Sequence, residues 1–339
     1  MADHGECWLK PTFSMISVKG EVMYHKGTSK VTIAEAKQKH IGTRLWKYRY
    51  LYLLVFPGML YFIIFRYVPM YGVVIAFQVF RINKGIWGSE WVGLAQFYKL
   101  FQGFSFPTVF KNTVVISLCK LIFGFPAPII LALLLNEVKN ARFKKVTQTI
   151  VYLPHFISWV ILAGLISMFL HPDSGLINEI VKVFNNGRGI DFLVSKQYFR
   201  GILVITDIYK GVGWGSIVYI AAISAIDSTV YEAAMVDGAN RLKQMWYITL
   251  PALKSTIVVM LILNMGGILN AGFEQILLLY NPLVYDVADI IDTYVYRNGI
   301  MSSNYSLSTA AGLFKSVISM GLIIITNKIA HMMEEDGLW

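Results

Sequence analysis

The sequence predicts an all-α integral membrane protein with six transmembrane helices. Of its 339 residues, 56% are hydrophobic and only 15% are charged, whereas soluble globular chains are usually about 45–50% apolar and about 25% charged. The mean hydropathy is +0.56, and the apolar residues gather in long windows. This composition excludes an ordinary cytosolic enzyme, a disordered regulator and a nucleic-acid-binding protein.

The apolar windows define the expected spans, because a helix that crosses a bilayer needs about 20 mostly apolar residues. Six windows qualify, at residues 51–77, 109–135, 150–170, 202–226, 255–279 and 307–329. We expect them to form one transmembrane domain over 46–330. The preceding segment, 1–45, is expected to be cytoplasmic and partly helical over 34–40; it lacks the apolar core of a signal peptide. Residues 331–339 are expected to form a cytoplasmic tail.

The basic residues predict the orientation of these spans, since cytoplasmic loops carry an excess of Lys and Arg. Nine Lys and Arg precede the first span within residues 1–50, and Lys139, Arg142, Lys144 and Lys145 follow the second span. The loop 280–306 contains a single basic residue. Both termini should therefore be cytoplasmic and this loop external, although the four basic residues in 171–200 depart from the pattern.

The sequence contains no recognisable cofactor or metal motif. Its two cysteines, Cys7 and Cys119, are too few and too far apart for a disulfide framework or a zinc site. Neither GxxxxGK[ST] nor GxGxxG occurs, so the chain does not bind ATP by those phosphate-binding loops. We therefore expect no metal and no cofactor in this chain.

One short motif stands out between the fourth and fifth spans, in the sequence YEAAMVDGANRLKQMWYITLP at 231–251. Ser228 or Thr229 is a suitable N-cap, and Glu232 would then lie in the first helical turn, where a carboxylate suits the helix dipole. Gly238 predicts a break before a second short helix. Such a helix–turn–helix on a cytoplasmic loop is a docking element; the alternative is an amphipathic linker at the membrane interface.

The spacing of this motif resembles the signature (EAA) loop of permeases from binding-protein-dependent ABC importers. The matching residues are Glu232, Ala233, Ala234, Gly238, Ile248, Leu250 and Pro251, with Asp237 before the glycine as in the extended form. Segments 69–77, 272–299 and 308–320 resemble permeases that import oligosaccharides and polysaccharides, a group related to the large maltose permease subunit. The resemblance covers most of the chain after about residue 45.

The resemblance implies a permease subunit in a bacterial cell membrane, with no catalytic residue of its own. A separate ATPase dimer would bind ATP and Mg²⁺, and a second, similar permease would complete the path. An extracytoplasmic binding protein would deliver the oligosaccharide. The ATPase-coupling helix would contain Glu232, Ala233, Ala234, Asp237 and Gly238.

The fourth span carries a candidate sugar-binding face, because Asp207, Lys210, Gly211 and Trp214 are spaced to lie on one side of a helix. Counted from the EAA motif, they fall where the maltose permease contacts its sugar. Ionisable residues inside spans are functional candidates, since burying them in a membrane is costly. The alternative is that Asp207 and Lys210 only neutralise each other.

The fifth span supplies the other substrate-binding candidates, Asn264, Asn270 and Glu274, among several glycines. Glycines allow close approach of a ligand or of another helix, so packing against the partner permease is an open alternative. Glu274 is expected either to contact sugar or to form a structural ion pair with Lys315 or Lys120.

Charged residues raise three further hypotheses. Lys120, Lys210 and Lys315, in or near spans, suggest that the carried sugar is acidic. Asp286, Asp289 and Asp292 would bind a cation or form a solvated helix face. An ion-coupled secondary transporter would instead use Asp207 and Glu274 to carry protons or sodium, but it would have no use for an EAA loop.

Overall fold

The computed structural model of the protein describes Trp46 and residues 48–332. The expected segment 1–45, including its helix at 34–40, lies outside the described residues, as do residues 333–339 of the expected tail. Residues up to Pro69 and residues from Met70 onward form two compact units. The contacts that build the core and the candidate site lie within the second unit.

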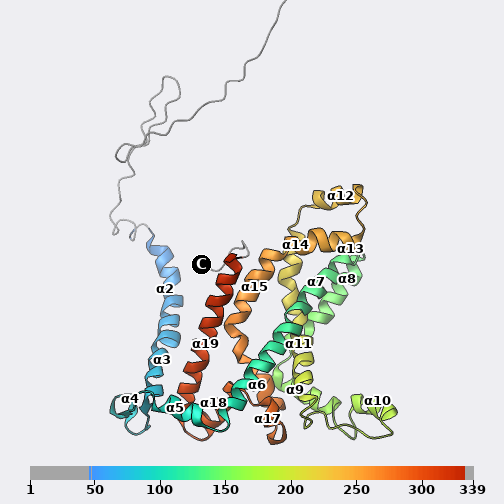
Figure 1. Ribbon diagram of the computed structural model, residues 1–339. Coiled ribbons are helices and arrows are strands. Elements are labelled where there is room, and N and C mark those ends of the chain that lie inside the picture. Colours follow the sequence, from blue (N-terminus) through green and yellow to red (C-terminus); the bar gives the residue numbers. More distant parts are fainter. Residues whose placement is uncertain (1–45, 47, 333–339) are drawn as a thin grey trace, which may run out of the picture. The chain divides into compact units, whose positions relative to one another are not determined.

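Helix dominates the described residues, as predicted (Figure 1). Five helical runs are long and apolar enough to cross a membrane, at Arg49–Phe77, Phe106–Glu137, Phe199–Ser224, Lys254–Leu279 and Tyr305–Met332. A sixth crossing results if the bent pair Ala141–Phe156 and Trp159–Phe169 counts as one span. The count of six is met in that way, but the window at 150–170 is not one straight helix: its two halves meet at 102°.

The helical runs are assembled from α-helical, 3₁₀ and π-helical pieces. The first three runs comprise α2 (Arg49–Phe62), η1 (Ile63–Tyr67), α3 (Val68–Met70) and η2 (Tyr71–Phe77); α6 (Phe106–Cys119), η3 (Lys120–Gly124) and α7 (Pro126–Glu137); and α8 (Ala141–Tyr152), η4 (Leu153–Phe156) and α9 (Trp159–Phe169). The others comprise α11 (Phe199–Ser224); α15 (Lys254–Gly267), η6 (Ile268–Asn270) and α16 (Phe273–Leu279); and α19 (Tyr305–Met332). The short helix α14 (Leu250–Ala252) directly precedes α15.

Short elements connect these runs. Between the first two runs lie the antiparallel strands β1 (Gln78–Val79) and β2 (Glu90–Trp91), with α4 (Gly85–Gly88) between them, and then α5 (Ala95–Gln102). The remaining connections contain α10 (Leu176–Phe184), α12 (Ser228–Val236), α13 (Arg241–Gln244), η5 (Met245–Thr249), η7 (Pro282–Val284), α17 (Tyr285–Ala288), α18 (Ile291–Val295) and η8 (Tyr296–Met301). In Figure 1, α12 and α13 lie at one end of the second unit, and α10, α17 and α18 lie at the other.

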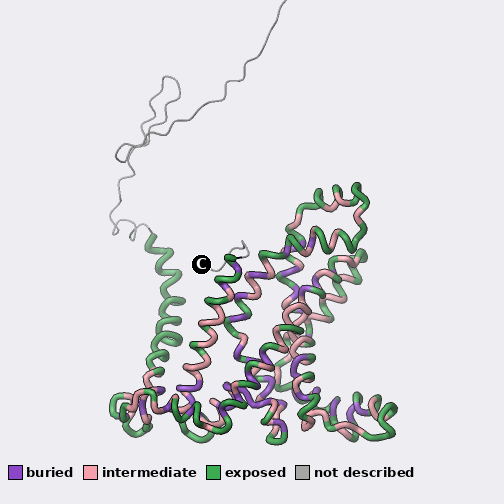
Figure 2. The backbone as a smooth tube through the Cα atoms, viewed as in Figure 1, coloured by how far each residue is buried: buried purple, intermediate pink, exposed green. Residues whose placement is uncertain are grey.

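Four buried apolar clusters lie within the described residues of the second unit, and α11 contributes to two of them. One cluster joins α6, α9, α11 and α16 to residues 284–290, with Phe199, Leu203 and Ile276 fully buried. The other joins α7 and α11 to Leu253, near the end that carries α13. Figure 2 shows that buried residues are densest toward the end with α17 and α18, while the long helices keep exposed faces suited to lipid.

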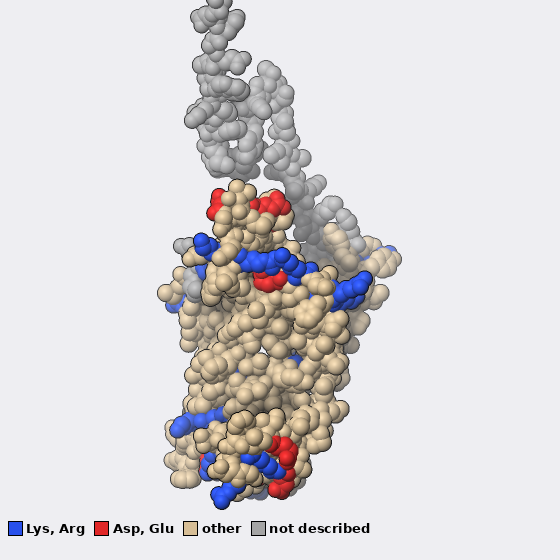
Figure 3. Space-filling model, turned by 90° about the vertical axis from the view of Figure 1, so that its right-hand side faces the viewer, with Lys and Arg blue, Asp and Glu red and all other residues tan. Residues whose placement is uncertain are grey.

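On the face drawn in Figure 3, few charged side chains lie at the middle of the helical bundle. Figure 3 shows Lys and Arg in a band near the end that carries α12 and α13, a wide zone with almost no charge, and a second charged group at the opposite end. Arg241 of α13 pairs with Glu137 at the end of α7, so the basic connection 138–140 and the motif loop lie at the same end. By the positive-inside rule this end is predicted to be cytoplasmic.

Candidate functional site

A polar cavity of about 460 Å³ lies among η3, α7, α11 and the broken fifth run. Three predicted substrate-binding residues line it, namely Asp207, Gly211 and Asn264. The other four are not among its lining residues: Lys210, Trp214, Asn270 and Glu274. The lining also includes Ser117, Lys120, Leu121, Gly124, Phe125, Pro128, Leu263, Gly267, Ile268, Ala271 and Gly272.

The charged group of this cavity is built around Lys120. Its Nζ donates to Asp207 Oδ1 at 3.0 Å and to Gln275 Oε1 at 2.5 Å. Gln275 is fully buried, and its amide nitrogen donates in turn to the carbonyl of Leu203 and to Thr206 Oγ1. The proposed alternative in which Asp207 pairs with Lys210 is therefore wrong, because Asp207 reaches across to another helix.

The fifth run is interrupted where it faces Lys120. Ala271 and Gly272 both have left-handed backbones, with φ of 50° and 83°, a region that only glycine enters at little cost. A Cβ on Gly272 would overlap the Lys120 ammonium. The carbonyl of Ile268 accepts from the Ala271 backbone N–H at 3.2 Å and from Ser117 Oγ at 2.6 Å. The break thus creates room for the lysine, and Ser117 ties its backbone to α6.

Lys210 fulfils a different role from the one predicted by its helical spacing. Its Nζ donates to the carbonyl of His155 at 2.9 Å and to that of Ile157, and it lies 5.5 Å from the ring centre of Trp159. These carbonyls belong to the bend in the third run, where Ser158 caps the following helix. Trp214 stacks on His155 with ring centres 4.6 Å apart. Both residues therefore stabilise the bend.

We expect Lys210→Met to loosen this bend. The substitution removes the donor to two carbonyls, and a buried group that loses its partner costs about 1–3 kcal/mol. The purified protein should unfold at a lower temperature and should become sensitive to proteases near residues 155–158. Lys145→Met, at an exposed lysine of α8, serves as a matched control. Unchanged stability and protection would contradict this role.

The remaining predicted residues of the fifth run make separate contacts outside the cavity lining or within their own helix. Asn264 donates to the carbonyl of Met260 in its own helix at 3.2 Å. Asn270 accepts from Lys315 Nζ, which also contacts both carboxylate oxygens of Asp292. Glu274 is exposed and forms no ion pair within the described part of the chain, so the predicted pairing with Lys315 or Lys120 is wrong.

The sequence predicts that the three aspartates of the loop 280–306 bind a cation or form a solvated helix face. Instead each pairs with a different basic residue: Asp286 with Lys196, Asp289 with Arg297, and Asp292 with Lys315. Within residues 46 and 48–332 no group of three or more His, Cys, Asp or Glu could hold a metal ion. The repeated three-residue spacing is interrupted because α17 ends at Ala288, before α18 begins at Ile291.

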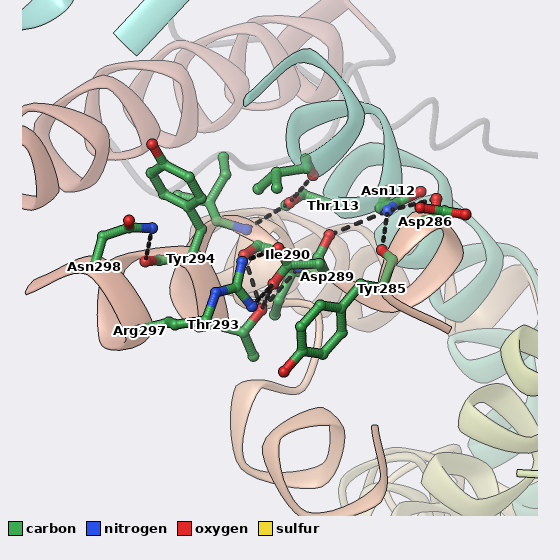
Figure 4. A network of polar contacts seen from close by, with 12 residues as sticks. Asn112, Thr113, Tyr285, Asp286, Asp289, Ile290, Thr293, Tyr294, Arg297 and Asn298 are labelled. Carbon is green, nitrogen blue, oxygen red and sulfur yellow. Dashed lines mark hydrogen bonds and ion pairs between the residues drawn. The ribbon is translucent and has the colours of Figure 1, made fainter. Parts of the chain in front are cut away.

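Asp289 belongs to a network that anchors the loop 280–306 (Figure 4). Its carboxylate accepts from both Arg297 guanidinium nitrogens, at 3.2 and 2.6 Å, and from Thr293 Oγ1 at 2.7 Å. Burial alone would lower the pKa of Arg297, but the hydrogen bonds and charge of Asp289 outweigh it and raise that pKa. From α6, the buried Asn112 donates to the carbonyls of Tyr285, Asp286 and Asp289. The loop is therefore fixed to the spans.

The motif at 231–251 forms two helices, as predicted, but with a different cap. Asp227 caps α12 by accepting from the Thr229 backbone N–H at 2.9 Å, which lowers the pKa of its carboxyl. The cap is thus neither Ser228 nor Thr229, and Glu232 lies in the second turn. Gly238 has a φ of 76°, and Asn240 caps α13. The predicted break is confirmed.

The surface of α12 is exposed although it contains apolar residues. Glu232, Ala233, Asp237 and Gly238 are exposed, and Ala234 is half-buried. Met235 and Val236 are 58% and 88% exposed. An exposed apolar helix rimmed by carboxylates is typical of a protein-docking surface, and α12 is held at its base where Tyr231 OH contacts Thr249 Oγ1 at 2.9 Å.

Sequence reasoning did not include Lys120, Ser117 or Gln275 among the site residues. Lys120 was considered only as a partner of Glu274 and as a hint of an acidic sugar. A lysine within a long apolar window is itself a functional signal. What the sequence does not show is that the second, fourth and fifth runs bring Lys120, Asp207 and Gln275 together.

A polytopic helical unit with a polar cavity among its spans and an exposed two-helix loop at one end defines a membrane permease. The comparisons with known proteins make this specific. The chain belongs to the family of binding-protein-dependent transport system inner membrane components, whose profile matches residues 124–334.

Individual relatives match over nearly the whole chain. The polygalacturonan/rhamnogalacturonan transport system permease protein YteP of Bacillus subtilis (strain 168) is 48% identical over 309 residues, which cover 91% of this chain and 96% of the relative. Protein LplB of the same organism is 48% identical over 291 residues, covering 86% and 91%. This chain is therefore an ABC transporter permease subunit for carbohydrate transport, and not an enzyme.

A solved structure agrees with this assignment. The crystal structure of a bacterial alginate ABC transporter, in complex with an alginate pentasaccharide-bound periplasmic protein, contains a chain that superimposes with a TM-score of 0.81. The two chains are 39% identical, and the match covers 88% of this chain and 100% of the other. The all-α permease fold predicted from the sequence is thereby confirmed.

Proposed function

We propose that this chain is one of two permease subunits of an ABC importer that carries uronate-containing oligosaccharides into a bacterial cytoplasm. The proposal of an acidic substrate rests on the ammonium of Lys120, which lies in the wall of the polar cavity. Of the three lysines that suggested an acidic sugar, Lys210 and Lys315 are engaged elsewhere. The named relatives are permeases for polygalacturonan/rhamnogalacturonan and alginate, which is consistent with an acidic substrate.

Energy for transport would come from a separate ATPase dimer that binds ATP and Mg²⁺. The exposed helix α12 would insert into this partner, with Glu232, Ala233, Ala234, Asp237 and Gly238 at the contact. Its small alanines permit close approach, and the carboxylate of Glu232 suits a basic group. A binding protein outside the cell would deliver the oligosaccharide, and a second, homologous permease would close the side of the cavity that this chain leaves open.

Transport would proceed by alternating access. Closure of the ATPase dimer would draw together the two α12 helices of the paired permeases and open the cavity outward, and ATP hydrolysis would return it to face inward. The basic end of the bundle, with α12, α13 and the end of α19, would lie in the cytoplasm. Both chain termini would then be cytoplasmic.

An ion-coupled sugar transporter is the second candidate, but no observation favours it. Its ion carriers would be Asp207 and Glu274, yet Asp207 is paired with Lys120 and Glu274 is exposed outside the cavity lining. An exposed two-helix loop with the EAA spacing has no role in such a carrier.

Uptake into proteoliposomes tests the proposed function. The complete transporter, with second permease, ATPase and binding protein, should accumulate trigalacturonate only when ATP is present inside. Fully methyl-esterified trigalacturonate has the same backbone without charge, and at concentrations that saturate the binding protein it should enter at least about tenfold more slowly, a loss equivalent to one charged hydrogen bond. Equal uptake of both compounds would refute the acidic substrate, and uptake without ATP would refute the ABC mechanism.

A further inference from the structure

We infer that Lys120 and Asp207 form a carboxylate-exchange pair, in which a carboxylate of the substrate takes the place of Asp207 on the Lys120 ammonium, and Asp207 returns when the substrate leaves. This inference rests on the proposed function, since it concerns how the same cavity binds and releases an acidic sugar. It assigns a role to Asp207 that differs from direct sugar contact: Asp207 limits the affinity of the site.

The two partners are held with unequal firmness. The Lys120 side chain is 12% exposed, whereas that of Asp207 is 38% exposed. Lys120 has a second contact, to Gln275 Oε1. Asp207 has Lys120 as the sole partner of its carboxylate within the described residues, through Oδ1. The lysine is therefore the fixed member of the pair, and the aspartate is the member that can move into the cavity.

The position of the ammonium does not depend on Asp207. The fully buried Gln275 is itself held by the Leu203 carbonyl at 2.8 Å and by Thr206 Oγ1 at 2.7 Å. The absence of a side chain on Gly272 leaves the space that the ammonium occupies. When Asp207 swings away, Lys120 therefore remains in place as a preformed cation facing the cavity.

The energetics favour an exchange over a simple addition. An unpaired ammonium in a low-dielectric site is costly, by several kcal/mol for an isolated ion, so the empty cavity needs Asp207. Replacing one carboxylate by another preserves the contact with Lys120, and the released Asp207 gains access to cavity water. The net gain on binding is then small. A transporter benefits from this, because a substrate held too tightly in mid-membrane would not leave.

Lys120 also presents an unused donor to the incoming substrate. An ammonium has three N–H groups, and two are engaged by Asp207 and Gln275. A sugar carboxylate can first accept from the remaining N–H and then take over the bond to Asp207. This order avoids a state in which the ammonium has lost its counterion.

The test measures binding and turnover separately in the complete transporter. Equilibrium binding of labelled trigalacturonate is measured on the purified complex without binding protein, and maximal uptake is measured in proteoliposomes with it. For Asp207→Asn we expect binding about tenfold tighter, since a competing charged hydrogen bond is removed, together with a lower maximal uptake rate. For Lys120→Met we expect binding of trigalacturonate to weaken at least about tenfold, with loss of the preference over the methyl ester.

Asp286→Asn is the matched control, because it removes a carboxylate from an exposed ion pair outside the cavity lining; binding and uptake should not change. If Asp207→Asn fails to assemble with its partners, Asp207→Ser is measured in its place, because it removes the same charge with less volume. Asp207→Glu retains the carboxylate and should bind and transport trigalacturonate as the wild type does. If trigalacturonate binds equally well or more weakly after the Asp207 charge is removed, the proposed carboxylate exchange is refuted.

The same measurements separate the exchange from the proposed function. A wild-type transporter that shows no preference for the acid over its methyl ester contradicts the proposed substrate class. A wild-type preference for the acid that persists while Asp207→Asn fails to tighten binding contradicts only the exchange, and leaves Lys120 as a simple binding residue.

Discussion

Gly238→Pro is expected to abolish ATP-driven uptake while the spans still insert in the membrane. Gly238 has a φ of 76° and its N–H donates to the carbonyl of Met235 at 3.1 Å. Proline fixes φ near −65° and has no N–H. The turn between α12 and α13 would have to rearrange, at a cost of about 3 kcal/mol or more, and α12 would no longer be presented to the ATPase.

The matched control is Gly238→Asn, because asparagine tolerates a left-handed backbone better than other residues do. This variant should retain most of the uptake. Glu232→Lys, which keeps the turn and reverses one exposed charge, should also uncouple ATP hydrolysis from uptake. Membrane fractionation and co-purification of the ATPase measure insertion and docking. If Gly238→Pro transports at the wild-type rate, α12 is not the coupling element.

Arg297→Met is expected to destabilise the loop 280–306 strongly. The side chain of Asp289 is 6% exposed, so the substitution leaves a buried carboxylate without its counterion. Breaking such a pair from one side typically costs about 3–5 kcal/mol. The apparent unfolding temperature of the purified transporter should fall, and residues 285–297 should become accessible to proteases.

A second substitution separates the buried charge from the loss of packing. Asp289→Asn in the Arg297→Met background removes the uncompensated charge, so the double variant should be more stable than Arg297→Met alone. Asp286→Asn, in the exposed pair with Lys196, should change stability by no more than about 1 kcal/mol. If the double variant is less stable than Arg297→Met, the stability of the loop does not depend on this buried charge.

The membrane architecture could be predicted from the sequence because it depends on composition over long windows. An apolar run of about 20 residues has few stable conformations in a bilayer other than a helix. The third run shows the limit of this argument. Its window at 150–170 predicts one span, yet the chain bends by 102° between Phe156 and Trp159. Lys210 from α11 donates to the carbonyls at this bend.

The candidate site was only partly predictable for a related reason. Helical spacing places Asp207, Lys210, Gly211 and Trp214 on one face, but one face of a helix can meet two different neighbours. Asp207 turns to Lys120 in the second run, whereas Lys210 and Trp214 turn to the bend in the third run. Spacing along one helix contains no information about what packs against it.

The aspartates of the loop 280–306 illustrate the same limit. Their regular three-residue spacing predicts one helix face, but the helix is interrupted between α17 and α18, and each aspartate pairs with a different basic residue. Ion pairs between residues distant in sequence, such as Lys196 with Asp286, are set by packing and cannot be read from local spacing.

The sequence by itself determined the all-α membrane class, five of the long apolar helices and the two-helix motif loop, because hydrophobic length, backbone hydrogen bonding and the glycine turn are local properties. Only the tertiary structure decided which intramembrane charges face the cavity. A buried ammonium or carboxylate takes the partner that packing brings within about 3 Å, and that partner lies on another helix: Asp207 for Lys120, and the carbonyls of the bend for Lys210.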